Sequence, residues 1–215
     1  MVSSLQVFND MDTHLSGDDN PSVYLSEIIT KLFKDIYPFT MLSDLFKTEQ
    51  SPLHHPEGNV FKHTLMVVDE AAKRKEHSEF PRAFMWAALL HDLGKAPTTR
   101  IRKDKLTSYD HDKVGEEMAN KFLIEFSKDK NFIKRVNSLV RWHMQILFVT
   151  KDLPFANIED MLSQVSLEEI SLFSLCDRLG RGHMTQDKIV EEQKNVQAFK
   201  TKCLNYSQSH LISKL

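Results

Sequence analysis

Apolar residues recur three and four positions apart along most of this chain, the spacing that places them on one face of an α-helix. The segment Pro81–Leu93 is apolar nearly all round, which indicates a central helix buried on every side. Strand-like alternation is weak and confined to Ile101–Tyr109. The spacing predicts an all-α, multi-helix bundle with helices over 22–37, 59–75, 81–93, 110–126, 132–147, 158–164, 167–179 and 185–206.

The first twenty residues differ from the rest of the chain. Residues 1–20 carry four Asp and no Lys or Arg, and they lack a sustained periodicity. We interpret them as an acidic, flexible or loosely attached N-terminal segment. A short helix that docks on the domain is the alternative. Residues 21–215 are expected to form one domain, which ends in the helix at about 185–206.

The composition is that of an ordinary globular protein, since 41% of the 215 residues are apolar and 27% are charged. With 6 Gly and 7 Pro, the chain has few residues for the turns of an all-β fold. A formal net charge of −2 argues against a broad phosphate-binding surface and therefore against duplex nucleic acid as a partner. The sequence has two Cys, no secretory pattern and no long apolar run, which together predict a reduced, cytoplasmic protein without a membrane partner.

Several imidazoles and carboxylates lie where the pattern calls for apolar residues. His91 and Asp92 are adjacent and close the buried helix, where a carboxylate is costly unless it is paired, hydrogen-bonded or bound to a metal. Other polar residues share an apolar face with their neighbours on four further predicted helices: His63, His111, His143 and Asp177. Each one alone is more often a core or rim residue, and Asp92 alone could be a surface residue at a helix end. Together they indicate a buried site that needs cations to compensate it.

The order of these residues resembles the HD-domain metal-dependent phosphohydrolase superfamily. The local strings are similar to the HD domain that follows the nucleotidyltransferase part of bacterial CCA-adding tRNA nucleotidyltransferases. They are HPEGNVFKHTL (55–65), AALLHDLGK (87–95), HDKVG (111–115), VRWH (140–143) and CDRLGRG (176–182), within a match over 54–182. No nucleotidyltransferase pattern accompanies them, so we expect a stand-alone HD domain and no CCA addition. The fourth block has one His where relatives often have two.

The resemblance implies an HD-domain bundle with a buried metal site. It implies one divalent ion held by His63, His91, Asp92 and Asp177, and a second held by His111 and His143, with Asp92 bridging the two. Some members of the superfamily bind a single ion, so one or two ions are expected. A nitrogen and oxygen donor set without Cys suits Mn, Fe, Co, Ni or Mg.

The implied activity is hydrolysis of a phosphate ester. The substrate would be a nucleotide, a 2′,3′-cyclic nucleotide or another small phosphate ester, with an RNA end as a further candidate. Asp92 and Lys95 are the expected catalytic residues, and Lys95 is expected to lie near the substrate phosphate. Arg178 and Arg181 flank the last ligand and either grip a phosphate or pair with an acidic neighbour. The alternative function is a module that senses a nucleotide or binds a partner with little catalysis.

Overall fold

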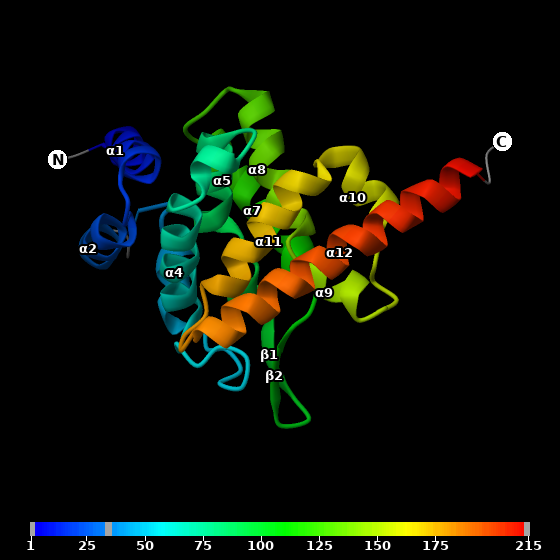
Figure 1. The fold of residues 1–215 in the computed structure, drawn as a ribbon. Coiled ribbons are helices and arrows are strands. Elements are labelled where there is room, and N and C mark those ends of the chain that lie inside the picture. The colour runs from blue at the N-terminus through cyan, green and yellow to red at the C-terminus, as the bar shows by residue number, and fades with distance from the viewer. Residues whose placement is uncertain (1–2, 33–35, 213–215) are drawn as a thin grey trace.

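Helices make up most of the computed structural model, which describes residues 3–32 and 36–212 (Figure 1). The α-helices are α1 (Ser4–Gly17), α2 (Ser22–Leu32), α3 (Thr40–Ser43), α4 (Val60–Ala72), α5 (Pro81–Leu90), α6 (Lys95–Thr98), α7 (His111–Ile124), α8 (Lys130–Trp142), α9 (Gln145–Thr150), α10 (Ile158–Gln164), α11 (Leu167–Leu179) and α12 (Gln186–Ile212). Two short 3₁₀ helices, η1 (Asp44–Lys47) and η2 (Lys75–His77), and a hairpin of β1 (Thr99–Arg102) and β2 (Lys105–Ser108) complete the fold. The predicted all-α class is confirmed. Part of the helix predicted over 22–37 lies outside the described residues.

The core is organised around α5, as its unbroken apolar sequence predicts. Every residue from Ala83 to Leu90 is buried, and the helix contacts α1, α4, α8 and α11. Pro81 occupies the first turn, where its missing N–H costs nothing because that donor has no partner inside the helix. Burial of an entire helix leaves its C-terminal end, and the residues that follow it, inside the protein.

Several predicted helices end earlier than the periodicity suggests, and two of these ends precede a candidate ligand. α5 ends at Leu90 rather than 93, and α8 ends at Trp142 rather than 147, so His91 and His143 both lie directly after a helix. Asp129 caps α8 by accepting from the backbone N–H groups of Asn131 and Phe132, which starts that helix before the predicted residue 132. Both histidines keep helical backbone angles as the C-cap residues of these helices, and both are buried in the interior.

A glycine allows the turn after α5 to lie directly on the start of α7. A Cβ atom at Gly94 would come within 2.0 Å of the His111 carbonyl oxygen and 2.6 Å of the Gly115 backbone nitrogen. Both neighbours are backbone atoms, which cannot rotate away. Only a residue without a side chain fits here, so Gly94 fixes the separation between His91–Asp92 and His111.

The weak alternating stretch at 101–109 corresponds to a two-stranded hairpin. The strands pair antiparallel, with Thr99 opposite Ser108 and Arg102 opposite Lys105. The two turn residues, Lys103 and Asp104, both have positive φ (49° and 58°), as a tight two-residue hairpin turn requires. In Figure 1 the hairpin extends beyond the helices at the lower edge of the bundle.

The N-terminal segment differs from the main expectation and agrees with the alternative of a docked helix. The buried residues of α1 are Val7, Phe8, Met11 and Leu15. Their spacing is helical, but the acidic residues of the segment make this pattern hard to recognise in the sequence. The Phe8 ring stacks on Trp86 with ring centroids 4.5 Å apart, and Asp12 accepts a 2.6 Å hydrogen bond from the Trp86 indole. Asp12 also pairs with Arg82, so part of the negative charge of this segment is neutralised within the fold.

At the other end of the chain, α12 runs from Gln186 to Ile212, farther than the predicted 206. Its residues Val196, Phe199 and Cys203 are buried, and it packs on α9 and α11. Its last turns extend away from the bundle in Figure 1. Among the described residues, no helix has both the length and the apolar character that crossing a membrane demands.

We predict that α1 contributes to the stability of the core. Replacing Phe8, which is 2% exposed, with Ala removes a buried ring and should lower the free energy of unfolding by about 3–5 kcal/mol in a urea titration. Leu5→Ala on the same helix is the matched control, because Leu5 is 52% exposed and its loss should change the free energy by less than about 0.5 kcal/mol. Equal, small effects of both changes would show that α1 is not part of the cooperative unit.

Candidate metal centre

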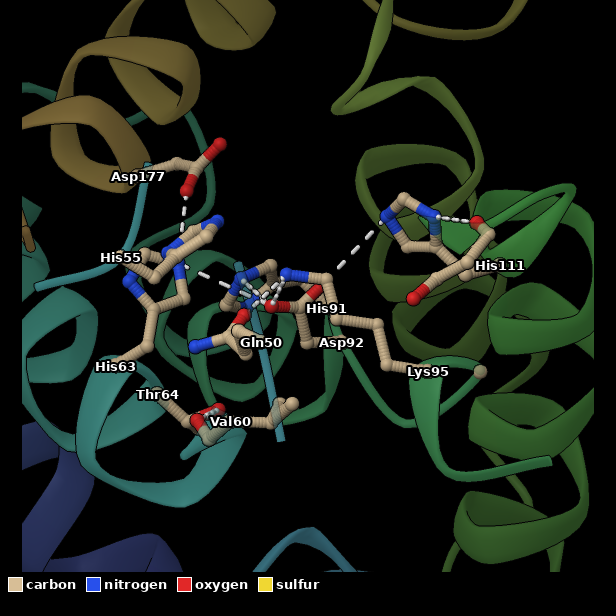
Figure 2. A network of polar contacts seen from close by, with 12 residues as sticks. Gln50, His55, Val60, His63, Thr64, His91, Asp92, Lys95, His111 and Asp177 are labelled. Atoms are coloured by element: carbon tan, nitrogen blue, oxygen red, sulfur yellow. Dashed lines mark hydrogen bonds and ion pairs between the residues drawn. The ribbon is translucent and has the colours of Figure 1, made fainter. Parts of the chain in front are cut away.

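The six residues expected to form the site converge in the interior of the bundle, and Figure 2 labels all of them except His143. They come from α4, the turn after α5, the start of α7, the turn after α8, and α11, and all are buried: His63, His91, Asp92, His111, His143 and Asp177. Two groups of possible ligand atoms share Asp92, one with His63 and His91 and one with His111 and His143, and in each group the atoms lie within 4.8 Å of one another.

Backbone carbonyl oxygens hold all four imidazole rings in one orientation. Each histidine directs Nδ1 at such an oxygen; the pairs are His63 to Gly180 (3.1 Å), His91 to Ala88 (3.0 Å), His111 to Ser108 (2.7 Å) and His143 to Val140 (2.7 Å). A carbonyl can only accept, so Nδ1 carries the hydrogen in each ring. In a neutral ring the Nε2 atom then presents a lone pair, which is the arrangement that metal-binding histidines adopt.

On the inner side, these lone pairs face other acceptors. The Nε2 atoms of His111 and His143 lie only 3.1 Å apart, and His91 Nε2 lies 3.2 Å from Asp92 Oδ2. His91 Nε2 and Asp92 Oδ1 are buried and have no hydrogen-bond partner among the described residues, whereas Asp92 Oδ2 has the Lys95 ammonium group 2.7 Å away. Apart from that ammonium group, the crowded acceptors repel one another. The donor set therefore fits a divalent cation, which would bind these lone pairs and the carboxylate together.

The protonation preferences of the cluster agree with this geometry. Burial, together with the neighbouring His143, lowers the pKa of His111 to about 4. Burial and the nearby His91 also lower the pKa of His143, so both rings are neutral at pH 7. Burial would raise the pKa of Asp92, but the adjacent His91 ring and the Lys95 ammonium group outweigh burial and hold that pKa well below its usual range. Neutral imidazoles and an ionised carboxylate are the forms that bind metal ions.

His63 holds a proton more readily than His111 and His143 do. Burial lowers its pKa, but hydrogen bonding to Asp177 and Glu57 outweighs burial and leaves the pKa raised. Its Nε2 atom lies 3.0 Å from Asp177 Oδ1 and 3.8 Å from Asp92 Oδ2. A proton and a cation would compete for this nitrogen.

Glu57 is a further buried carboxylate beside the cluster, and no sequence pattern singled it out. Its Oε1 atom accepts from His55 Nδ1 at 2.9 Å and lies 3.0 Å from His63 Nδ1, and its Oε2 atom accepts the Gly182 N–H at 2.9 Å. Burial raises the pKa of Glu57, but these hydrogen bonds outweigh it and hold the pKa far below its ordinary value. Glu57 thus ties the loop before α4 and the turn after α11 to His63. A carboxylate in a loop carries no sequence pattern that distinguishes it from an exposed one.

Lys95 reaches the cluster, as expected. Its ammonium nitrogen lies 2.7 Å from Asp92 Oδ2 and donates a 2.7 Å hydrogen bond to Gln50 Oε1. The side chain is 11% exposed, so its charge is close to solvent but held at the edge of the buried site (Figure 2). Gln50, which the sequence analysis did not identify, fixes the position of this ammonium group.

The two arginines after Asp177 were expected either to grip a phosphate or to pair with an acidic neighbour, and they differ in how closely they pair. Arg178 Nη1 lies 2.8 Å from Glu192 on α12, so it pairs with an acidic neighbour. Arg181 lies 3.9 Å from the same carboxylate, a weaker contact. Both arginines also line the pocket beside the cluster. The Nε atoms of both are buried and have no hydrogen-bond partner among the described residues.

A pocket of about 520 Å³ opens directly onto the cluster. Asp92, His111, His143 and Asp177 form its floor, and Lys95 and Arg181 are among the residues of its walls. The volume is within the range of pockets that bind small organic ligands. The arrangement therefore combines a buried donor set that could hold a cation, fixed positive charge and space for a ligand.

We predict that Glu57 stabilises the fold through its three hydrogen bonds. In Glu57→Gln the amide NH₂ must face either the Gly182 N–H or the histidine N–H groups, which leaves donor opposite donor. The free energy of unfolding, measured in urea with a chelator present, should fall by about 1–3 kcal/mol. Glu168→Gln is the control, because that carboxylate is 74% exposed and its pair with Lys200 contributes little. Equal losses in the two variants would contradict the structural role of Glu57.

Comparisons with known proteins agree with the geometry. Residues 60–180 match the family model of the HD domain. The Multifunctional CCA protein of Actinobacillus pleuropneumoniae serotype 5b (strain L20) is 35% identical over 111 residues, which are 49% of this chain and 26% of that protein. The Multifunctional CCA protein of Hahella chejuensis (strain KCTC 2396) is 32% identical over 121 residues, 56% of this chain and 26% of that protein.

A shorter match, to the Multifunctional CCA protein of Aromatoleum aromaticum (strain DSM 19018 / LMG 30748 / EbN1), is 50% identical over 54 residues, 25% of this chain and 12% of that protein. The chain thus spans about a quarter, or less, of the length of the curated relatives it matches. The family model, in contrast, covers more than half of the chain and includes all six residues of the buried cluster. This chain belongs to the HD domain family.

Proposed function

We propose that this protein is a metal-dependent phosphohydrolase that acts on a nucleotide, a 2′,3′-cyclic nucleotide or another small phosphate ester. One observation carries the proposal: the Nε2 lone pairs of His111 and His143 face each other at 3.1 Å beside Asp92, at the floor of a ligand-sized pocket. Such a donor set suits a cation, and a cation exposed to a pocket binds anionic oxygen. Phosphate esters are the substrate class that this combination suits best.

The ligand atoms divide into two groups around Asp92. His63, His91, Asp92 and Asp177 would hold one divalent ion, and Asp92, His111 and His143 would hold a second. Bound divalent cations in such sites polarise a phosphoryl oxygen and make water a stronger nucleophile at neutral pH. The nitrogen and oxygen donors favour Mn, Fe, Co, Ni or Mg as the ion.

The cationic side chains of the pocket would orient the substrate phosphate. Lys95 lies between Asp92 and the pocket, where its ammonium group would contact a phosphate oxygen and stabilise the charge that develops during hydrolysis. Arg181 is 28% exposed and only weakly paired, so it is free to turn toward the same phosphate. Arg178 is held by Glu192 and would contribute positive charge from a fixed position.

In the proposed reaction the oxygen of a water molecule bonds to phosphorus, the ester P–O bond breaks, and the departing alcohol takes up a proton. Asp92 would keep the reacting centre at the junction of the two ligand groups. The buried position of Asp92, with 1% of its side chain exposed, limits competing contacts with solvent. The similarity to Multifunctional CCA proteins supports a substrate of the nucleotide class.

We predict that Asp92 is required for metal binding. Asp92→Asn removes the charge shared by both ligand groups, so metal analysis of the purified protein should find the one or two ions of the wild type lost. Asp104→Asn is the control, since Asp104 lies in the hairpin turn and is exposed, and it should keep the wild-type metal content. Circular dichroism verifies that both variants fold. Wild-type metal content in a folded Asp92→Asn protein would refute the assignment.

We predict that Lys95 supports turnover rather than metal binding. Lys95→Ala should lower kcat on the best substrate by roughly 10²–10³-fold, as loss of a charge-stabilising donor does in other enzymes, while metal content stays near that of the wild type. The assay uses a panel of phosphomonoesters, 2′,3′-cyclic nucleotides and dinucleoside polyphosphates under several divalent ions. Equal losses of metal and turnover would make Lys95 a structural residue. A wild-type protein that binds metal and nucleotides but hydrolyses none of the panel would instead be a sensing or binding module.

A further inference from the structure

The β1–β2 hairpin carries a concentration of positive charge that contrasts with the rest of the chain. Residues 99–109 contain four basic side chains and one acidic side chain, in a protein whose net charge is −2. The basic residues are all exposed: Arg100, Arg102, Lys103 and Lys105. No ion pair joins any of them to a carboxylate within the described part of the chain, whereas Lys73, Arg82 and Arg141 each have an acidic partner. The charge of the hairpin is therefore available to an external anion.

The strand register gathers this charge on one face. Arg100 lies opposite Thr107, and Arg102 lies opposite Lys105, so these four side chains share a side of the two-stranded sheet. Like charges that lie opposite each other destabilise a strand pair, and a hairpin with only two strands is marginally stable by itself. Arg102 donates to the Thr107 hydroxyl at 2.6 Å, which orients the guanidinium group but leaves its charge uncompensated. A bound anion would compensate it.

The end of β2 reaches the candidate metal centre. Thr107 on the basic face of β2 and Tyr109 directly after β2 both line the pocket, together with Leu106 and Ser108. The Tyr109 ring is 65% exposed, and the Arg102 guanidinium lies 4.8 Å from its centroid. In Figure 1 the hairpin extends outward from the bundle. Tyr109 joins the two regions, because it lines the pocket together with Asp92 and His111 and its ring contacts Arg102 of the basic face.

We propose that this face, formed by Arg100, Arg102, Lys105 and Tyr109, binds a single-stranded nucleic acid whose terminal phosphate ester enters the pocket. The proposal rests on the proposed phosphohydrolase function and extends its substrate from one nucleotide to the end of a strand. Basic side chains that follow a phosphate backbone, combined with an aromatic ring on which a base stacks, are the elements of single-strand recognition. Few cations and a pocket of about 520 Å³ suit one flexible strand rather than a duplex.

The direct test is binding of a fluorescein-labelled, eight-nucleotide single-stranded RNA, followed by fluorescence anisotropy at several salt concentrations. The triple variant Arg100→Gln/Arg102→Gln/Lys105→Gln should bind at least about tenfold more weakly at low salt, and its salt dependence should be shallower by about 2 in the log–log slope, because three phosphate contacts are lost. The variant removes the like-charge pair of the hairpin, so thermal unfolding should show no loss of stability. Lys128→Gln/Lys130→Gln/Lys134→Gln is the control, with the same change of charge near the α7–α8 connection at the opposite end of the bundle.

A kinetic comparison links the surface to the reaction. In the wild type, kcat/KM should be at least about tenfold higher for a short oligonucleotide than for the mononucleotide with the same terminal group, and the hairpin triple variant should lose this difference while keeping its rate on the mononucleotide. Tyr109→Leu should weaken oligonucleotide binding, and Tyr109→Phe should retain it, since stacking needs the ring and not the hydroxyl.

The outcomes separate the two proposals. Hydrolysis of mononucleotides with no effect of the triple variant on RNA binding would overturn the hairpin surface and leave the phosphohydrolase intact. Salt-sensitive RNA binding that the triple variant abolishes, without hydrolysis of any phosphate ester, would support the surface and refute the proposed function. Equal affinity for a poly-glutamate peptide and for RNA would also overturn the surface, because it would show recognition of any polyanion without a contribution from the bases.

Discussion

Imidazole lone pairs and a carboxylate crowd together in the interior of this protein with the Lys95 ammonium group in contact with the carboxylate, and much of the surrounding structure serves to keep them there. His111 and His143 come from different helices, yet their Nε2 atoms lie 3.1 Å apart. They hold this position because the opposite nitrogen of each ring donates to a backbone carbonyl oxygen. A rotation of either ring would break that bond, so a cation bound between the rings would relieve the repulsion without any rearrangement of side chains.

The same constraint explains features that lie outside the cluster. Gly94 brings the turn after α5 against the start of α7, where any Cβ atom would meet the His111 carbonyl oxygen. Glu57 connects the loop before α4 to the turn after α11 through His63 and Gly182. Lys95 lies 2.7 Å from Asp92 and partly balances the negative charge that burial isolates from water. Helix ends, a glycine and a buried ion pair thus act together to fix the positions of a few side chains.

The helices and the six clustered residues could be predicted from the sequence. The spacing of apolar residues indicates the helices, and the order of the polar residues along the chain indicates the cluster. His63, His143 and Asp177 stand out as polar residues on apolar faces, and that contrast is a property of local spacing. Glu57 and Gln50 could not be recognised in this way, since they lie in a loop and gain their roles from contacts made across the fold. The α1 helix was obscured by the acidic composition of residues 1–20, although Val7, Phe8, Met11 and Leu15 carry the helical spacing. The hairpin was only a weak pattern, because most of its side chains are exposed and polar.

If the buried donor set binds a cation, anomalous X-ray diffraction from crystals grown with Mn²⁺ will locate that ion without reference to activity or substrate. We expect anomalous density bonded to the Asp92 carboxylate and to the Nε2 atoms of the histidines that face it, with each Nδ1 still donating to its backbone carbonyl oxygen. Density confined to exposed surface carboxylates, with the cluster unchanged and free of metal, would show that the cluster is not a cation site.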